Sequence, residues 1–335
     1  MSTTRLSLRQ THDLIAAALT RSRTSAENAA SVATALVAAE TAGQGGHGLR
    51  RVVSYCAQAA SGKVDGFAVA DLKRTAPGAL IVDAGHGFAY PALDMVAAAL
   101  PDIAREQGVA LATIIRSHHC GVMGVFVEQF ADAGLIALML ANTPAGIAPW
   151  GGKTPLLGTN PIAFAAPISG DRPVVIDLSL SKVARGKIMA AKQKGEPIPP
   201  GWACDSEGNP TTDAAKALEG TMVPIGDAKG TALALMVELL AAGLAGANFA
   251  YQATSFFDAD GAPPGTGQFV LAIDPVRIGG HGAADRFAEL AARIAGDPGA
   301  RLPGRRRQAL RDEAQSQGIL ADAALIAEIE AIGQE

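Results

Sequence analysis

Apolar positions recur at helical spacing near both ends of the chain and at strand spacing in its middle. Ser7 and Gln10 form a capping box, and apolar residues follow it at helical spacing. Thr24 and Glu27 predict a second capping box, which opens an alanine-rich helix that runs to a glycine cluster. Helical spacing resumes over residues 49–60, so the N-terminal part is predicted to be helical.

Short apolar runs in the middle of the chain predict a sheet. Strands are predicted at residues 68–75, 79–83, 109–115, 135–142, 162–166, 174–178 and 268–274. Helices are predicted at residues 89–107, 125–133, 184–194, 226–247, 283–295, 305–317 and 321–332. Several strands follow one another through short turns, which implies antiparallel pairing. We therefore expect an α+β protein with a mixed, largely antiparallel sheet.

The glycine cluster at residues 43–48 carries the first candidate for chemistry. His47 and Arg51 are four residues apart, which would place both side chains on one face of a helix. An imidazole can give or take a proton, and a guanidinium can hold a carboxylate with two parallel hydrogen bonds. The pair suits a 2-oxo acid or its reduced form, although a solvated helix start could show the same spacing.

The glycines of this cluster also match the Gly-x-Gly-x-x-Gly fingerprint of dinucleotide-binding folds. That fingerprint requires a strand before the glycines and a helix after them. Residues 26–42 are predicted to be helical instead, and the side chains of His47 and Arg51 would crowd a phosphate. We therefore predict a fold other than Rossmann.

Two further segments could hold an anion. Residues 116–124 join a predicted strand to a predicted helix, where backbone N–H groups are free. Residues 301–307 place four arginines on a tight turn. An ordinary loop and a solvated surface are the simpler interpretations of these two segments. His118 and His119 lack a third ligand at metal spacing, so no metal site is expected.

Composition narrows the classes of function. The 335 residues are 49% hydrophobic, which is enough for a large core. A net charge of −4, dispersed basic residues and 4% aromatic residues argue against nucleic-acid binding. Three isolated cysteines and an N-terminus without a signal-peptide pattern lead us to expect a cytoplasmic protein. Glu238 interrupts the apolar run at 231–247, which favours a buried helix over a membrane span.

Seven short motifs occur in order along nearly the whole chain. They are His47-Gly48-x-x-Arg51, Ser117-His118-His119-Cys120-Gly121, Trp150-Gly151-Gly152-Lys153, Gly158-Thr159-Asn160-Pro161, Asp177-Leu178-Ser179, Ala184-Arg185-Gly186-Lys187 and Pro303-Gly304. With these motifs the chain resembles the malate/L-lactate dehydrogenase family. That non-Rossmann family also includes sulfolactate, ureidoglycolate and diketogulonate oxidoreductases and the piperideine/pyrroline-2-carboxylate reductases.

The resemblance implies a homodimeric NAD(P)-dependent oxidoreductase that acts on a small carboxylate substrate. It implies a helical N-terminal part at residues 1–75 that carries the catalytic histidine, and a mixed-sheet cofactor-binding domain at residues 76–280. The C-terminal helices at residues 281–335 would pack back on the N-terminal part. The active site would lie between these parts, and the second subunit could contribute to it. No nucleic-acid or membrane partner is expected.

Carried over by position, the resemblance also implies individual roles. His47 would be the proton donor or acceptor, and Arg51 would anchor the substrate carboxylate. Further substrate contacts would come from Thr159, Arg185, Gly186 and Lys187. Cofactor contacts would come from His119, Cys120, Gly121, Val122, Met123, Asp177, Leu178, Ser179, Lys229, Arg301, Gly304, Arg305 and Arg307. The cofactor would be NADP or NAD, and the arginine turn favours NADP.

Several positions depart from the family pattern. Many relatives have serine where this chain has Gly46, and the imine reductases have serine where it has Gly43. The sequence therefore names no group that would orient His47. Lys187 matches the hydroxy-acid branch, whereas the imine reductases carry an acid there. Ala228 stands where a histidine is common.

Three functions remain open at this point. The first is hydride transfer between a nicotinamide and a 2-hydroxy or 2-oxo acid of the malate, lactate or sulfolactate type. The second is NADPH-dependent reduction of a cyclic imine acid such as pyrroline- or piperideine-2-carboxylate. The third is a non-catalytic cofactor-binding homologue, which only Gly46 favours.

Overall fold

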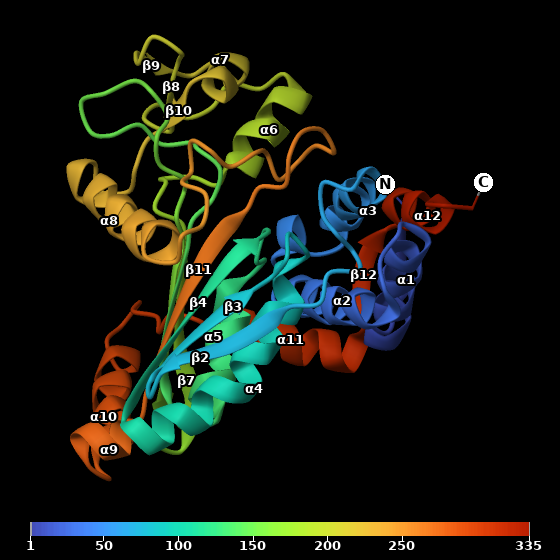
Figure 1. The fold of residues 1–335 in the computed structure, drawn as a ribbon. Helices are drawn as coiled ribbons and strands as arrows, with labels where there is room; N and C mark the ends of the chain where they lie inside the picture. The colour runs from blue at the N-terminus through green and yellow to red at the C-terminus, as the bar shows by residue number, and fades with distance from the viewer. Residues whose placement is uncertain (1, 335) are drawn as a thin grey trace.

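The computed structural model describes residues 2–334 and is built around a seven-stranded sheet in the order β2-β3-β4-β11-β5-β6-β7 (Figure 1). The strands are β2 (Asp71–Ala76), β3 (Ala79–Asp83), β4 (Val109–Ser117), β5 (Ile136–Ala141), β6 (Ile162–Ile168), β7 (Asp171–Leu178) and β11 (Thr266–Ile273). Neighbouring strands are antiparallel except β3 and β4, which are parallel and joined by α4 (Ala89–Gln107). The predicted mixed, largely antiparallel sheet is confirmed.

The sheet separates two hydrophobic cores because successive side chains of a strand point to opposite faces. In β5, Ala137 and Met139 face one core, and Leu138 and Leu140 face the other. The first face is covered by α4 and α5 (Met123–Asp132), and the second by α8 (Ala228–Glu238) with its π-helical continuation η3 (Leu239–Gly243). Figure 1 shows α4 and α8 on opposite sides of the sheet.

The two ends of the chain meet beside the sheet (Figure 1). Here the N-terminal helices α1 (Leu8–Arg21), α2 (Ala26–Thr41) and α3 (Val52–Ser61) contact α11 (Arg305–Gln317) and α12 (Ala323–Ala331). The strand β1 (Thr3–Leu6) pairs antiparallel with β12 (Ile319–Asp322). The helix predicted over residues 321–332 therefore begins later, because its first residues pair with β1. The division of the chain into three parts stays a prediction.

The predicted helix starts can be checked at their caps. At α1, Ser7 and Gln10 form the predicted capping box, in which each side chain accepts the other's backbone N–H. At α2 the prediction is off by one residue, because Ser25, and not Thr24, accepts the N–H of Asn28.

The region between β7 and β11 contains several short elements. They are α6 (Arg185–Lys194), β8 (Ala203–Cys204), β9 (Pro210–Thr211), α7 (Ala214–Glu219) and β10 (Thr221–Met222). The three strands form a small sheet of their own, in a region where the sequence predicted no strand. After β11 the chain continues as α9 (Pro275–Gly279) and α10 (Ala283–Ala295), and α10 packs on β6.

Glu238 lies at the end of α8 and ties three segments together. Its carboxylate accepts hydrogen bonds from Asn142 Nδ2 at 3.1 Å, Asn160 Nδ2 at 2.7 Å and the Ala250 N–H at 2.5 Å. Burial raises the pKa of Glu238, and these donors oppose the shift.

Of the helices formed by residues 2–334, none is long and apolar enough to cross a membrane.

Candidate active site

His47 and Arg51 lie at the ends of two short 3-10 turns, η1 (Gly45–His47) and η2 (Leu49–Arg51). Gly48 separates the turns with φ −105° and ψ −130°, so the prediction of one helix carrying both residues is wrong. The break follows from Glu40, whose carboxylate accepts the N–H of Leu49 at 2.8 Å. A Cβ atom at Gly48 would lie 2.1 Å from Glu40 Oε2, so only glycine leaves room for this contact.

The side chain of Arg51 nevertheless extends back to the backbone next to His47. Its Nε donates to the carbonyl of Gly46 at 3.0 Å, directly before His47. Its Nη1 donates to the carbonyl of Phe256 at 3.4 Å, and its guanidinium carbon lies 4.6 Å from the centre of the Phe257 ring. The arginine is only 9% exposed. The expected proton carrier and carboxylate anchor thus lie together without a continuous helix.

His119 provides the contact to His47 that the sequence left unnamed. The Nδ1 atom of His47 lies 3.1 Å from Nε2 of His119, and the two rings stack at 11° with their centres 5.0 Å apart. His119 Nδ1 is in turn hydrogen-bonded to the hydroxyl of Tyr55, and that hydroxyl lies 3.1 Å from the hydroxyl of Tyr90. A chain of three buried groups, from His119, Tyr55 and Tyr90, therefore orients His47.

Burial keeps this chain uncharged at neutral pH. Burial and, to a smaller extent, the nearby charge of Arg51 together lower the pKa of His47 to about 4. Burial also lowers the pKa of His119 well below its usual value and raises that of Tyr55 to about 12. If Tyr90 donates to Tyr55 and each group donates to the next, the one proton of His47 sits on Nε2 and can be donated; if the chain runs the other way, His47 donates from Nδ1 to His119 and Nε2 is free to accept a proton.

A second cluster joins predicted cofactor residues at the start of α5. The N–H of Gly124 donates to Asp177 Oδ2 at 2.9 Å, and Arg307 Nη2 donates to the Asp177 carbonyl at 2.9 Å. A Cβ atom at Gly124 would lie 2.8 Å from Arg307 Nη1, so the three segments touch. Because Asp177 occupies the Gly124 N–H, a phosphate at this helix start would compete with a carboxylate. The segment from His119 to Met123 links this cluster to His47.

One cavity extends from the cluster, and a second, larger one adjoins it at the arginine turn. One of about 450 Å³ is lined by residues 42–44, 175–178 and parts of the turn from Pro303 to Leu310. The other, of about 740 Å³, lies between α10 and residues 300–306. Gly304 has φ +89° and packs against the backbone of Val175, which fixes the turn between the cavities. The predicted Asp177, Leu178, Gly304 and Arg307 line the smaller cavity.

The arginines of this turn differ in their pairing. Arg305 is bound to Asp171, and Arg307 lies 3.5 Å from the carboxylate of Asp177. The guanidinium of Arg306 has no hydrogen bond or ion pair to any other side chain or carbonyl in residues 2–334, and it lines both cavities. Arg301 lines only the larger cavity. Arg306 was absent from the predicted contacts, although the arginine run at 305–307 was its signal.

Other predicted site residues lie apart from His47. Arg185 donates to the carbonyl of Leu218 at 3.0 Å and so ties α6 to α7, and its neighbours Gly186 and Lys187 are exposed. Thr159 pairs with Thr143, Ser179 pairs with Ser181, and Lys229 is exposed at the start of α8. Within residues 2–334, none of these residues forms a hydrogen bond or ion pair with His47 or Arg51. Their roles stay predictions.

Comparisons with known proteins agree with this geometry. The profile of the family described as malate/L-lactate dehydrogenase matches residues 6–330. A (2R)-3-sulfolactate dehydrogenase (NADP(+)) of Chromohalobacter salexigens is 51% identical over 309 residues, which is 92% of each chain. A Δ1-pyrroline-2-carboxylate reductase of Ancylobacter novellus is 40% identical over 332 residues, covering 98% of this chain and 97% of the other.

Solved structures show the same fold. The Δ1-piperideine-2-carboxylate reductase of Pseudomonas syringae pv. tomato superposes with a TM-score of 0.93 at 38% identity, covering 98% of this chain and all of the other. The sulfolactate dehydrogenase of Methanocaldococcus jannaschii superposes with a TM-score of 0.88 at 28% identity, covering 98% and 96%.

This mixed sheet, with a paired histidine and arginine beside it, defines an NAD(P)-dependent oxidoreductase of non-Rossmann architecture. The chain belongs to the malate/L-lactate dehydrogenase family, as its motifs predicted.

The lowered pKa of His47 predicts an unusual pH profile for oxidation. Only the neutral ring can accept a proton, and with a pKa of about 4 it is neutral throughout the usual assay range. We expect kcat/KM for hydroxy-acid oxidation to stay level from about pH 8 to about pH 5 and to fall towards pH 4. A fall centred near pH 6.5 would contradict this assignment. Returning each sample to neutral pH and repeating the assay controls for acid inactivation.

Proposed function

We propose that this protein interconverts a small 2-hydroxy acid and its 2-oxo acid with NADP(H), and that the acid is 3-sulfolactate or a close analogue. The observation that supports the reaction is the His47 imidazole, held by His119 and adjacent to the Arg51 guanidinium. The named substrate rests on the 51% identity to a (2R)-3-sulfolactate dehydrogenase over 92% of both chains.

In the proposed mechanism, each residue does what its surroundings allow. Arg51 binds the carboxylate of the substrate through its free Nη2 edge, which fixes the carbon next to that carboxylate. His47 then takes the hydroxyl proton in oxidation and returns it to the oxygen in reduction. The stacked His119 and the Tyr55 hydroxyl hold the His47 ring while its charge changes. When bound, NADP(H) accepts or supplies the hydride.

We propose that the smaller cavity holds this cofactor. The smaller cavity begins at Gln44, three residues before His47, and extends to the arginine turn. The turn presents Arg306 without a protein partner, and a guanidinium binds phosphate well. We propose that Arg306 contacts the 2′-phosphate that distinguishes NADP from NAD, and that Asp177 and Arg307 hold the neighbouring backbone in place.

Reduction of a cyclic imine acid is the second candidate. It is favoured by 40% identity to a Δ1-pyrroline-2-carboxylate reductase and by the neutral state of His47, since a basic imine needs less help from an acid. Lys187 argues against this candidate, because a lysine at that position matches the hydroxy-acid branch; its side chain is exposed on α6.

The proposed reaction can be tested with one panel of substrates and two variants. With NADPH, we expect turnover of 3-sulfopyruvate to exceed that of pyruvate, oxaloacetate and the cyclic imines. His47→Asn should lower kcat by about 10²- to 10⁴-fold, the range of general acid–base catalysis, with little change in NADPH binding. Arg51→Lys should chiefly raise KM, because lysine cannot form the two-pronged contact.

Preferred turnover of a cyclic imine would replace the first candidate with the second. Full activity of His47→Asn would remove His47 from the chemistry, whichever substrate is preferred.

Cofactor choice gives a separate prediction for Arg306. Arg306→Ala should raise KM for NADPH by about tenfold or more while leaving KM for NADH nearly unchanged, because only NADPH carries the extra phosphate. Arg293→Ala is the matched control, since this exposed arginine on α10 pairs with Glu289 and lines neither cavity. Equal effects of Arg306→Ala on both cofactors would show that Arg306 does not read the 2′-phosphate.

We also propose that the protein is a homodimer and that α8 lies in its interface. The outward face of α8 and η3 is apolar, with Leu235 48% exposed, Leu239 55% exposed and Leu244 61% exposed. A helix that is apolar all round is usually buried, and a second copy of the chain would bury this face.

We also propose that the protein is cytoplasmic, because its three free cysteines fit a reducing compartment.

Light scattering tests the dimer directly. The wild-type protein should have twice the monomer mass, and Leu239→Lys should shift it towards the monomer, because a charge would then have to be buried. Leu290→Lys is the control, since Leu290 is equally exposed on α10, away from α8. A monomeric wild-type protein would contradict the proposal.

A further inference from the structure

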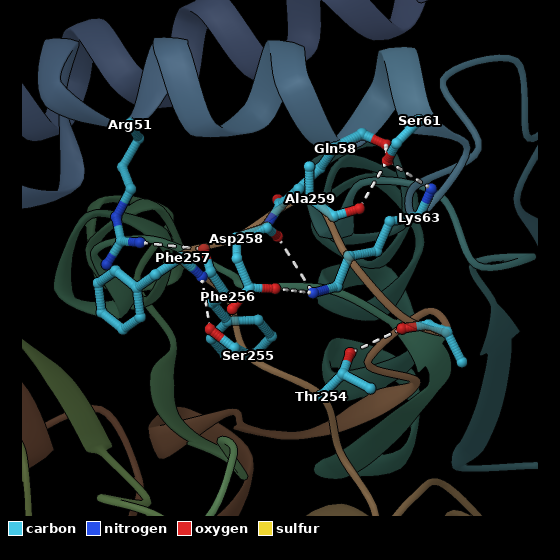
Figure 2. Close-up of polar contacts among 11 residues, drawn as sticks. Arg51, Gln58, Ser61, Lys63, Thr254, Ser255, Phe256, Phe257, Asp258 and Ala259 are labelled. Carbon is cyan, nitrogen blue, oxygen red and sulfur yellow. Dashed lines mark hydrogen bonds and ion pairs between the residues drawn. The ribbon is translucent and has the colours of Figure 1, made fainter. Parts of the chain in front are cut away.

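The segment of residues 254–262, which we call the strap, crosses the active-site side of α3 without regular secondary structure (Figure 2). Its ends are closed by a hydrogen bond from Thr254 Oγ1 to the carbonyl of Ala262 at 2.7 Å. It lies in the connection between η3 and β11, far in sequence from α3. Its contacts with α3 therefore determine how it sits over the site.

The strap is hydrogen-bonded to α3 and to Lys63, which lies two residues after the end of α3. Gln58 Nε2 donates to the Asp258 carbonyl at 2.8 Å, and Ser61 Oγ donates to the Ala259 carbonyl at 2.9 Å. Lys63 Nζ reaches both the carbonyl of Asp258 at 3.1 Å and its Oδ1 at 2.8 Å. Figure 2 shows these contacts side by side.

The pair of Lys63 and Asp258 is the charged part of this fastening. The side chain of Lys63 is fully buried, whereas that of Asp258 is 52% exposed. A buried ammonium group is costly unless an anion and hydrogen bonds compensate it. The hydrogen bond from Lys63 also lowers the pKa of Asp258, so the carboxylate stays charged at neutral pH. The pair therefore fixes the position of the strap along α3.

The two phenylalanines that precede Asp258 contact the side chains of His119 and Arg51. Phe256 is buried, and its ring centre lies 5.4 Å from that of His119. Phe257 lies under the Arg51 guanidinium at 4.6 Å from the ring centre, while the Phe256 carbonyl accepts from Arg51 Nη1. The strap therefore touches both the imidazole pair and the arginine (Figure 2 shows the arginine side).

We propose that the strap is a positioning device for Arg51, in which Phe257 and the ion pair of Lys63 and Asp258 set the orientation of the guanidinium that binds the substrate carboxylate. Gly46 and Phe256 accept from Nε and Nη1, and the Phe257 ring supports one face of the guanidinium. The Nη2 group keeps both of its N–H groups and Nη1 keeps its second one, so the edge formed by Nη1 and Nη2 can hold the two oxygens of a carboxylate. This inference rests on the proposed role of Arg51 as the carboxylate anchor.

A consequence is that residues which never touch the substrate control its affinity. If the strap shifts along α3, the Phe256 carbonyl and the Phe257 ring leave Arg51, and the guanidinium loses its orientation. A bidentate contact depends on that orientation, so binding of the acid weakens. NADPH binding depends on other residues and should not change.

The test uses the full-length protein and two readouts. Binding of oxamate, a non-reducible analogue of a 2-oxo acid, is measured by calorimetry on the complex with NADPH, and KM and kcat are measured for the preferred substrate. Asp258→Ala removes the anion of the ion pair, and Phe257→Leu keeps an apolar side chain but removes the ring. Asp260→Ala is the matched control, because Asp260 is an exposed acid of the same strap without an ion pair to residues 2–334.

We expect Asp258→Ala to weaken oxamate binding and to raise KM by about tenfold, with a smaller change in kcat. Phe257→Leu should weaken oxamate binding by about two- to fivefold, the size of a cation–π contact. Asp260→Ala should change neither value, and the Kd of NADPH should stay the same in all three variants.

The proposal is overturned if both test variants bind oxamate like the wild type, or if the Kd values of NADPH and oxamate rise together, as in general misfolding. Failure of wild-type protein to bind oxamate would also overturn it. The proposed function can fail separately: if the wild type reduces only cyclic imines, oxamate still reports on the carboxylate seat, and the expected ratios are the same.

Discussion

The hydrogen bond between two neutral imidazoles, His47 and His119, is the interaction on which the rest of the site depends. This bond needs one ring nitrogen without a proton as the acceptor. Burial and the charge of Arg51 lower the pKa of both rings, so each ring is neutral and has such a nitrogen. The Tyr55 hydroxyl bonds the other ring nitrogen of His119, so both nitrogens of His119 have a partner. A serine beside His47 is therefore not needed to orient it, which accounts for Gly46 at that position.

The sheet brings these groups together from distant parts of the chain. His47 comes from the turn after α2, His119 from the loop after β4, and the strap from the connection before β11. The same arrangement places Asp177 at the end of β7 against Gly124 at the start of α5, next to the segment that carries His119. His47 and Arg51, the proposed cofactor cavity and the strap thus form one continuous region around the N-terminal helices.

Local patterns in the sequence predicted local structure well. The strand at residues 79–83 and the helices at 89–107 and 305–317 have the predicted bounds, because apolar spacing and end signals lie within each segment. The pairing of β1 with β12 joins the two ends of the chain, and no local pattern reveals it. In the site, the sequence identified His47 and Arg51, but their proximity comes from the contact of Arg51 with Gly46 and not from a helix. Tyr55 and the strap phenylalanines were missed because they look like ordinary core residues until the fold places them.

The central claim is that His47 and Arg51 act on one and the same small acid. A crystal structure of the protein with NADPH and oxamate tests it most directly. The account predicts that the oxamate carboxylate lies on the Nη2 edge of Arg51, with its amide carbonyl oxygen within hydrogen-bond distance of His47 Nε2. An oxamate bound away from Arg51, or a His47 ring that faces away from it with the His119 contact broken, would contradict the account.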